Sequence, residues 1–493
     1  MNILLVYPRI PDTFWSFKHA MKFISKKASH PPLGLLTIAA MLPETWKKKV
    51  VDLNVKKLHD REIAQADYVC ISAMSVQEES AMQVIERCRK FNKTIVAGGP
   101  LFTADPDAFG SIDHLILNEG ELTFPEFLAD IQMQCAKKVY KSSAYANLLE
   151  TPAPDYSLVK VSDYATLSIQ YSRGCPFNCE FCEITSLLGK KVRVKSSKQI
   201  LLELDQILDS GYRGNIFIVD DNFIGNRKVL KEDLLPKIIA WMETHNYPFI
   251  FTTEASLNLS DDQVLLDLMV RAGFAKVFIG IETPHIGSLV ECGKQLNASR
   301  NMMECVRNIH DAGIEVSAGF IVGFDNDSAE VFQQQIDFIQ KSGIITAMVG
   351  LLTAPNHTRL YKRLFKEGRI LFRSNGDNTS HRLNFIPKMD RELLLNGYKY
   401  ILDSIYSRKA YYQRLKDFLK GYHPLRILRS GYSKENLMAL LRSIFYIGIV
   451  SKCRFQYWDL FFWSLFKRPD LFPMAITYSI YGYHFRKVFG VVS

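Results

Sequence analysis

The sequence predicts an α/β protein in three parts: a doubly wound domain over residues 1–140, a partial (β/α)6 barrel over 141–360 and a mainly helical domain over 361–493. Short apolar strands alternate with amphipathic helices, and this alternation starts again after a polar, proline-containing stretch at 137–155 that we interpret as a linker. Beyond residue 360 the strand patterns end and long amphipathic runs follow. A chain of 493 residues, 47% of them hydrophobic and 23% charged, is not a disordered protein.

The first part has the pattern of a Rossmann-like sheet. Its expected strands are 2–8, 50–54, 68–75, 94–100 and 114–121. Strands that are apolar throughout and separated by helices indicate a parallel sheet covered on both faces. Ligands bind such sheets at the carboxyl ends of the strands. The candidate contacts there are Ser72, Met74, Ser75, Gln77, Gly98, Gly99, Glu119 and Gly120, although a tight turn explains the two successive glycines equally well.

The second part repeats a strand–helix unit six times. Its expected strands are 167–173, 215–222, 249–257, 276–282, 315–323 and 347–354. The helical stretches 198–210, 261–272 and 298–312 lie between some of them. Six such units form an incomplete barrel, which also carries its functional residues at the carboxyl ends of the strands.

Three cysteines directly after the first barrel strand give the strongest signal. Cys175, Cys179 and Cys182 have the spacing C-x3-C-x2-C. Iron–sulfur clusters take thiolate ligands from compact loops, and three ligands on four irons leave one iron open. A zinc site would need a fourth cysteine or histidine nearby, and none is present. We expect the scattered cysteines to be buried core thiols: Cys70, Cys88, Cys135, Cys292, Cys305 and Cys453.

This cysteine motif, in this place, resembles the radical S-adenosylmethionine (SAM) superfamily. Phe181, the aromatic residue before the third cysteine, also matches. The resemblance implies a [4Fe-4S] cluster on the three cysteines, SAM chelated by the open iron, and adenine recognition by the backbone of Phe181. Polar residues at the next strand ends are then candidate SAM contacts: Asp220, Asp221, Asn222, Glu254 and Glu282. Any one of these carboxylates could instead cap the following helix.

The order of motifs further resembles the cobalamin-binding subfamily. The segments 30–35, 72–77, 98–100 and 118–121 precede the barrel in the same order, and the similarity covers about residues 1–355. The chain also resembles the branch that includes hopanoid C-2 methylase. Cobalamin is therefore the third implied cofactor. The D-x-H-x-x-G motif of many cobalamin domains is absent from the first domain, so we expect no imidazole below the cobalt.

The resemblance implies a C-methyltransferase that moves a methyl group from methylcobalamin to an unactivated carbon. The substrate would be a small molecule or lipid, such as a hopanoid, and electrons would come from a flavodoxin or ferredoxin. A second hypothesis keeps both cofactors but catalyses a rearrangement, cyclisation or oxidation. A third is an iron–sulfur regulator that binds nucleic acid. We expect no nucleic acid, because the basic C-terminal part has no recognition motif.

Positive charge and aromatic residues concentrate at the C-terminal end. Residues 361–493 hold 24 Lys and Arg against 9 Asp and Glu, and 27 of the chain's 59 aromatic residues. The stretch 452–487 combines both features. It predicts peripheral contact with a membrane. The alternative is that these aromatic residues form the core of a helical lid and the charges are solvated. We expect the protein in the cytoplasm, because residues 1–8 have the pattern of a β-strand rather than of a signal peptide.

Overall fold

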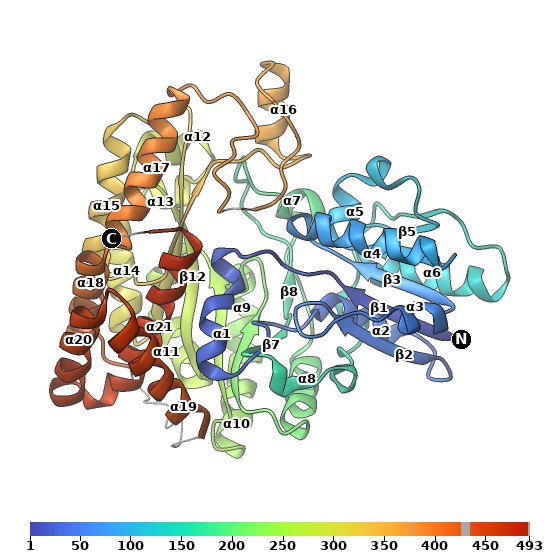
Figure 1. Cartoon of the computed structure of the whole chain (residues 1–493), viewed down its shortest axis with the longest axis horizontal. Coiled ribbons are helices and arrows are strands. Elements are labelled where there is room, and N and C mark those ends of the chain that lie inside the picture. The colour runs from blue at the N-terminus through green and yellow to red at the C-terminus, as the bar shows by residue number, and fades with distance from the viewer. Residues whose placement is uncertain (378, 425–433, 492–493) are drawn as a thin grey trace.

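The computed structural model describes residues 1–377, 379–424 and 434–491. It confirms the predicted fold class: two parallel sheets stand side by side, and helices from the C-terminal part pack against the second (Figure 1). The first sheet has the strand order β2-β1-β3-β4-β5-β6. These strands are β1 (Asn2–Tyr7), β2 (Lys47–Asp52), β3 (Tyr68–Ser72), β4 (Thr94–Gly98), β5 (His114–Ile116) and β6 (Val139–Tyr140).

Helices cover both faces of the first sheet, as a doubly wound fold requires. One face packs on α2 (Leu33–Met41) and α6 (Gly120–Gln132). The other packs on α3 (Asp60–Gln65), α4 (Glu78–Lys90) and α5 (Pro100–Ala104). The alternating side chains Leu4 and Leu5 enter the two separate cores, which explains why these strands are apolar throughout.

The expected linker over 137–155 is wrong in its first part. Val139 and Tyr140 form β6, which extends the first sheet in parallel to β5. The Tyr140 hydroxyl donates to Asp130 at 2.8 Å, which anchors this edge to α6. A strand of two residues is too short to show an apolar pattern, so the sequence could not reveal it.

The second sheet is an open half-barrel whose strands are neighbours in chain order. It consists of β7 (Thr166–Ile169), β10 (Gly214–Ile218), β11 (Phe249–Ala255), β12 (Phe274–Glu282), β13 (Glu315–Val322) and β14 (Ala347–Leu351). Its outer helices include α8 (Ser197–Asp209), α10 (Leu235–Thr244), α11 (Gln263–Ala272), α14 (Met302–Asp311) and α15 (Glu330–Ser342). The expected helix 298–312 starts later, because Asn301 caps α14 by accepting from the Glu304 N–H.

The inner face of the half-barrel is more open than its outer face. Along β11, Phe251 and Thr253 on the outer side are completely buried, whereas Thr252 and Glu254 on the inner side are partly exposed. On β12 the buried Ile279 alternates with the partly exposed Phe278 in the same way. Inward side chains fill the interior of a closed barrel. Here the inward-facing side chains of β11 and β12 remain partly exposed.

The C-terminal part is helical, as predicted. Its elements are α16 (Arg359–Lys366), α17 (Arg391–Ile405), α18 (Arg408–Gly421), α19 (Lys434–Ser443), the π-helical η10 (Ile444–Val450), α20 (Arg454–Lys467) and α21 (Phe472–Val488). α17 packs on α15 outside the half-barrel, while α20 packs on α18 and α21.

A segment of the first domain crosses to these helices. After β1 the chain forms η1 (Phe14–Ser16) and α1 (Lys18–Ile24), which contacts α19 and α21 (Figure 1). The Phe14 ring stacks on Phe485 of α21 with centroids 4.3 Å apart. The Trp15 ring meets Phe278 of β12 edge-on at 5.1 Å. This segment therefore reaches the inner face of the half-barrel, which the sequence did not predict.

Candidate active site

The three clustered cysteines lie on a loop between β8 (Ser172–Arg173) and α7 (Ile184–Leu187). β8 pairs antiparallel with β9 (Arg193–Val194), and Gly174 makes the turn into the loop with φ of +93°. A side chain on Gly174 would put its Cβ 2.7 Å from the Lys191 carbonyl oxygen, so glycine is required. All three thiols are free and partly exposed. Burial, together with the nearby Cys179 and Cys175, raises the pKa of Cys182 to about 12.

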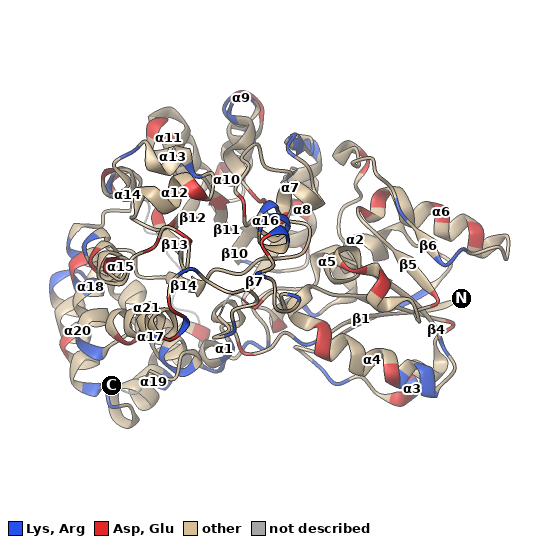
Figure 2. Ribbon diagram, turned by 90° about the horizontal axis from the view of Figure 1, so that it is seen from above, with Lys and Arg blue, Asp and Glu red and all other residues tan. Residues whose placement is uncertain are grey.

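Two distant parts of the chain hold this loop. The Glu180 N–H donates to the Cys292 carbonyl oxygen at 2.8 Å, and the Leu360 N–H donates to the Glu180 carbonyl oxygen at 2.9 Å. The Glu180 carboxylate accepts from Arg363 Nε at 2.8 Å and Nη2 at 3.1 Å. Helix α16 lies at this end of the half-barrel, with its Lys and Arg residues close to α7 (Figure 2). Neither anchor could be identified from sequence.

The remaining cysteines are buried as expected, with one exception. Cys292 is buried with Phe324 and Leu352, and its thiol donates to the Leu289 carbonyl oxygen at 3.5 Å. Cys135 is exposed, so its prediction as a core thiol is wrong. It lies just beyond the end of α6, where the chain turns toward β6.

Asp220, Asp221 and Asn222, which follow β10, support the loops at the strand ends. Asp220 is buried and accepts from the backbone N–H groups of Tyr171 at 2.8 Å and Ser172 at 2.9 Å. Burial raises the pKa of Asp220 to about 7. Asp221 accepts from the Gly174 N–H at 3.2 Å, and the Asn222 side chain accepts from the N–H of the residue after β11 at 3.2 Å. Asp220 and Asp221 therefore shape the approach to the cysteine loop.

Glu254 differs from these neighbours because its carboxylate has no hydrogen-bond or ion-pair partner in the described part of the chain. It projects from the end of β11 on the inner face. Burial, together with the charges of Asp221 and Asp220, raises the pKa of Glu254 to about 8. The site therefore gathers acidic groups that a cationic ligand would stabilise.

Glu282, at the end of β12, forms an ion pair with Lys294 at 2.9 Å. Lys294 Nζ also donates to the Gly280 carbonyl oxygen at 3.1 Å. Burial lowers the pKa of Lys294, but the charges of Glu282 and Cys179 outweigh it and raise the pKa overall. The sequence predicted Glu282 but missed this lysine, which brings a positive charge to the cysteine loop.

The predicted contacts of the first sheet gather at one edge, because β3, β4 and β5 are neighbours. Gly98 pairs with Ser72 on one side and Ile116 on the other. A Cβ on Gly98 would lie 2.8 Å from the Ile116 carbonyl oxygen, and one on Gly99 3.0 Å from Ser72 Oγ. The protein's own packing therefore requires both glycines.

The other predicted residues after β3 divide into two kinds. The buried Gln77 uses its amide internally: Nε2 donates to the Pro8 carbonyl oxygen at 2.6 Å, and Oε1 accepts from the Met74 N–H at 2.9 Å. Met74 is exposed, and Ser75 lines a pocket. At this sheet edge Met74 and Ser75 are thus better placed to meet a ligand than Gln77.

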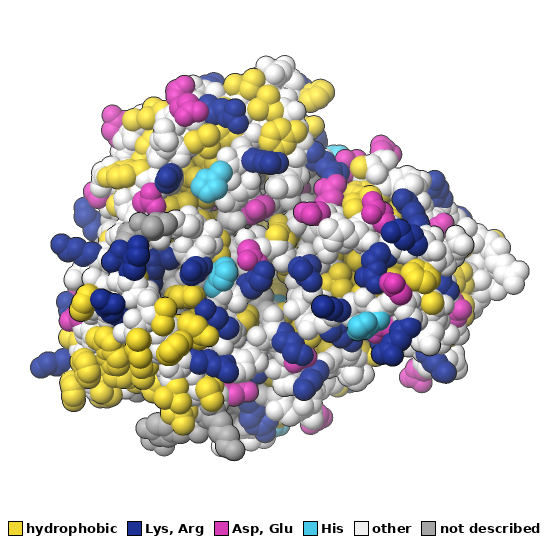
Figure 3. All heavy atoms as spheres, viewed as in Figure 1, with side chains coloured by type: hydrophobic (Ala, Val, Ile, Leu, Met, Phe, Trp, Pro, Cys, Tyr) yellow, Lys and Arg dark blue, Asp and Glu magenta, His cyan; other side chains and the backbone are white. Residues whose placement is uncertain are grey.

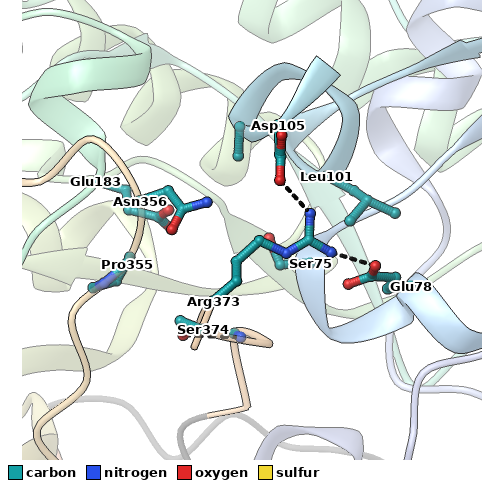
Figure 4. Close-up of a pocket in the computed structure, with 11 residues that line it drawn as sticks. Ser75, Glu78, Leu101, Asp105, Glu183, Pro355, Asn356, Arg373 and Ser374 are labelled. Carbon is teal, nitrogen blue, oxygen red and sulfur yellow. Dashed lines mark hydrogen bonds and ion pairs between the residues drawn. The ribbon is translucent and has the colours of Figure 1, made fainter. Parts of the chain in front are cut away.

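This pocket lies between the two sheets (Figure 4). Leu101 and Asp105 line it from the first domain, and Glu183 lines it from beside the cysteine loop. The chain after β14 closes it through Arg373, whose guanidinium pairs with Asp105 at 2.8 Å and with Glu78. The carboxyl ends of both sheets thus border a common space.

Glu119 and Gly120 have structural roles of their own. Arg173 Nη1 and Arg193 Nη1 each donate to Glu119 Oε1 at 2.9 Å, and Arg173 also pairs with Glu121 at 2.7 Å. A Cβ on Gly120 would lie 2.5 Å from Ile38 Cδ1 of α2. The Glu119 carboxylate joins the first domain to the β8–β9 ribbon, and its predicted contact with a ligand stays a prediction.

Comparison with known proteins assigns each part. Residues 23–128 match the B12 binding domain, 169–368 the Radical SAM superfamily, and 358–493 a domain of unknown function (DUF4070). The chain is 34% identical to the hopanoid C-2 methylase of Rhodopseudomonas palustris over 93% of this chain and 88% of that protein. It belongs to the cobalamin-binding radical SAM family. An uncharacterized methyltransferase of Synechocystis is 37% identical over 98% of this chain and 91% of its own length.

Solved structures show the same fold. The cobalamin-dependent SAM radical enzyme OxsB, with aqua-cobalamin and SAM bound, matches all of this chain and 81% of its own with a TM-score of 0.65 and 17% identity. TsrM of Kitasatospora setae, with cobalamin and a [4Fe-4S] cluster bound, matches 78% of this chain and 82% of its own with a TM-score of 0.56 and 14% identity. As a member of this family, the protein uses a [4Fe-4S] cluster, SAM and cobalamin.

The residues of this radical SAM enzyme fit SAM. SAM carries a sulfonium and an ammonium group, and the unpartnered Glu254 is the group that would meet a cation. Lys294, the cation beside the cysteine loop, suits the SAM carboxylate. The phenyl ring of Phe181 packs against Phe324 with centroids 6.2 Å apart, and the adenine contact of its backbone stays a prediction.

Two histidines of the first domain lie away from Gly98 and Gly99. His114 begins β5, at the opposite edge of the sheet, and Leu58 and Asp60 beside His59 bond to Arg87 near the end of α4. His114 is further held by the Lys137 carbonyl oxygen at 2.6 Å. The individual contacts predicted for SAM and cobalamin stay predictions.

Proposed function

We propose that this enzyme is a C-methyltransferase that adds a methyl group to an unactivated carbon of a hydrophobic substrate. The observation that carries this proposal is its similarity, over almost its whole length, to two proteins named as methylases or methyltransferases. The shared pocket supports it, because methyl donation and hydrogen abstraction must act on one substrate. When bound, SAM on the cluster supplies hydrogen abstraction and cobalamin supplies the methyl group.

The chain's own residues would bind and orient the cofactors and shield them from water. Cys175, Cys179 and Cys182 would hold the cluster. Glu254 would orient the cationic groups of SAM, and Lys294 its carboxylate. Helix α21 and the segment with Trp15 restrict the entry of water to the inner face, which protects reactive groups from side reactions.

A hydrophobic substrate suits the inner face. The rings of Phe278 and Trp15 meet there, and the partly exposed Phe217 of β10 contacts the ring of His30 with centroids 5.5 Å apart. Burial lowers the pKa of His30 to about 4, so it stays neutral near pH 7. These groups can contact a hopanoid or another polycyclic lipid without exposing it to a charge. Such a substrate implies peripheral contact with a membrane, and the reaction implies a flavodoxin or ferredoxin as reductant.

The test uses the full-length protein, reconstituted without oxygen with iron, sulfide, cobalamin and SAM, and incubated with lipid and metabolite extracts. We expect a product heavier by about 14 mass units, with one S-adenosylhomocysteine and one 5′-deoxyadenosine released per product. Cys179→Ala is the matched control and should give none of these. Formation of 5′-deoxyadenosine with a product of unchanged carbon count would instead support the rearrangement, cyclisation or oxidation hypothesis.

A further inference from the structure

The C-terminal helices expose a large apolar surface on one side of the molecule. We call it the docking edge and define it by Phe445, Ile449, Val450, Phe455, Phe462 and Phe466, from η10 and α20. Between 50% and 74% of each of these residues is exposed. Figure 3 shows hydrophobic side chains gathered over this part of the molecule, with Lys and Arg around them. Apolar patches of such extent mark interaction sites on soluble proteins.

Folding alone does not account for this surface. Tyr457, Leu460 and Ser464 already supply α20 with a buried face, which packs against α18 and α21. Phe455, Phe462 and Phe466 lie outside that face and keep between 50% and 74% of their surface exposed. A helix that is apolar on several sides needs a second apolar environment. The expectation that these aromatic residues only form a core is therefore incomplete.

The charges beside the docking edge identify its partner. Lys452, Arg454 and Lys467 are exposed at the two ends of α20. The exposed acidic residue of this helix, Asp459, is paired with Lys416 at 3.1 Å. An apolar centre with a basic border complements an anionic lipid surface. A second copy of the chain fits less well, because two-fold pairing would bring like charges together.

We propose that the docking edge binds the surface of an anionic bilayer, with Phe455, Phe462 and Phe466 of α20 in the interface and the basic residues at the headgroups. The helices would lie on the membrane, since none in the described ranges is long and apolar enough to cross one. This proposal identifies the surface that would make the membrane contact implied by the proposed function. It can be tested separately, because lipid binding requires neither a cofactor nor catalysis.

The docking edge is connected to the inner face of the half-barrel. The neighbouring α19 holds α1, because Arg442 Nη1 donates to the Lys22 carbonyl oxygen at 2.7 Å and to Ser25 Oγ at 2.6 Å. The same segment carries Trp15, which contacts Phe278 inside the half-barrel. A membrane bound at the docking edge would thus lie beside the elements that border the substrate space. This last step rests on the proposed function.

The experiment compares sedimentation of the full-length protein with vesicles of phosphatidylcholine alone and with phosphatidylglycerol added. We expect binding to the anionic vesicles that weakens with salt. The triple variant Phe455→Ser, Phe462→Ser, Phe466→Ser should bind at least about tenfold more weakly, because it removes the apolar contact. Phe365→Ser is the matched control, since Phe365 is equally exposed but belongs to α16, and it should bind like the wild type.

Two measurements separate the alternatives. Circular dichroism should show the same thermal transition for the triple variant and the wild type, so that lost binding is not lost folding. Turnover of detergent-dispersed substrate should be unchanged in the triple variant, which distinguishes docking from catalysis. Unchanged vesicle binding by the folded triple variant would overturn the proposal. The proposal would also be overturned if the wild type formed a dimer that the triple variant cannot form and if its vesicle binding did not depend on vesicle charge. The docking edge would then be an interface with a second copy of the chain.

Discussion

The two strand-end faces that border the pocket use their residues in opposite ways. At the half-barrel, the thiols of the cysteine loop and the carboxylate of Glu254 are left available for ligands. At the first sheet, Gln77 and Glu119 are occupied by the protein itself, and Gly98 and Gly99 are required by strand packing. Both faces nevertheless belong to domains that bind cofactors.

This difference predicts where each cofactor's affinity comes from. In the half-barrel, particular atoms would make the bonds: thiolates to iron and charged groups to a zwitterionic ligand. The first sheet instead offers backbone and small side chains at a shaped edge, which suits a large ring system. Substitution of a single side chain should therefore change cofactor binding strongly at the half-barrel. At the first sheet, cofactor binding should depend mainly on the conformation of the backbone.

The largest expected effect tests the thiols. Cys179→Ala removes one ligand, so reconstituted protein should lose its four-iron cluster and all reductive cleavage of SAM. Iron content, the visible absorption of the cluster and 5′-deoxyadenosine measure this. Cys292→Ala is the control, because its buried thiol donates to the Leu289 carbonyl oxygen and lies among apolar side chains, and most cleavage should remain. Equal loss in both variants would mean that the ligand set is wrong.

The ion pairs between the two faces come next. Arg173→Met should destabilise the chain by about 3–5 kcal/mol, because it leaves Glu121 and part of Glu119 buried without their partner. Urea unfolding measures this loss. Lys137→Met breaks an exposed pair with Glu126 in the same domain and should leave the midpoint unchanged. If Arg173→Met and Lys137→Met had similar urea midpoints, the buried ion pairs of Arg173 would not stabilise the contact between the domains.

Local spacing explains what the sequence could predict. The three cysteines lie within eight residues, so their chemistry is visible without the fold. The strand ends were predictable because apolar strands alternate with helices, and parallel strands bring their carboxyl ends to one edge. Glu254 was predicted as a candidate SAM contact because it lies at the carboxyl end of such a strand. Sequence order thus predicted the fold class and the cofactors, and it predicts that ligands bind at these strand ends.

Contacts between distant residues explain what it could not predict. Glu119 meets Arg193 across 74 positions, and Glu180 meets Arg363 across 183. Arginine and glutamate are common on surfaces, so nothing in their local pattern distinguishes buried partners. The crossing of Trp15 to Phe278 likewise depends on how the domains pack. The side-chain assignments at the first sheet were weakest for this reason.

The pH dependence of stability sharpens the comparison at Glu254. Its carboxyl has a pKa raised to about 8 by burial, so between about pH 4.5 and 8 the folded chain binds a proton that the unfolded chain has lost. Stability from this group is therefore present at low pH and is lost as pH rises through that range. At about pH 8 the free energy of unfolding of Glu254→Gln should exceed that of the wild type by on the order of 2–4 kcal/mol, and its unfolding temperature should be higher. At about pH 4.5 the two proteins should not differ in this way. Thermal unfolding of the cofactor-free chain measures this, and parallel pH profiles for both proteins would contradict it.

The smallest effect concerns the backbone of the first sheet. Gly99 has φ of +94° and ψ of −178°, a conformation that side chains rarely adopt, so Gly99→Ala should cost about 1–3 kcal/mol of stability. It should also weaken cobalamin binding, because the new methyl group displaces Ser72 at the edge where the ring would lie. Gly34→Ala is the control: no atom lies within 4 Å of its Cβ position, and it belongs to α2, where alanine favours the helix. Titration of the full-length chain with cobalamin, followed by absorbance, should give normal affinity for the control. If Gly99→Ala lost stability but bound cobalamin as tightly as Gly34→Ala, this glycine would serve the sheet alone, and the cofactor would have to be held further from β4.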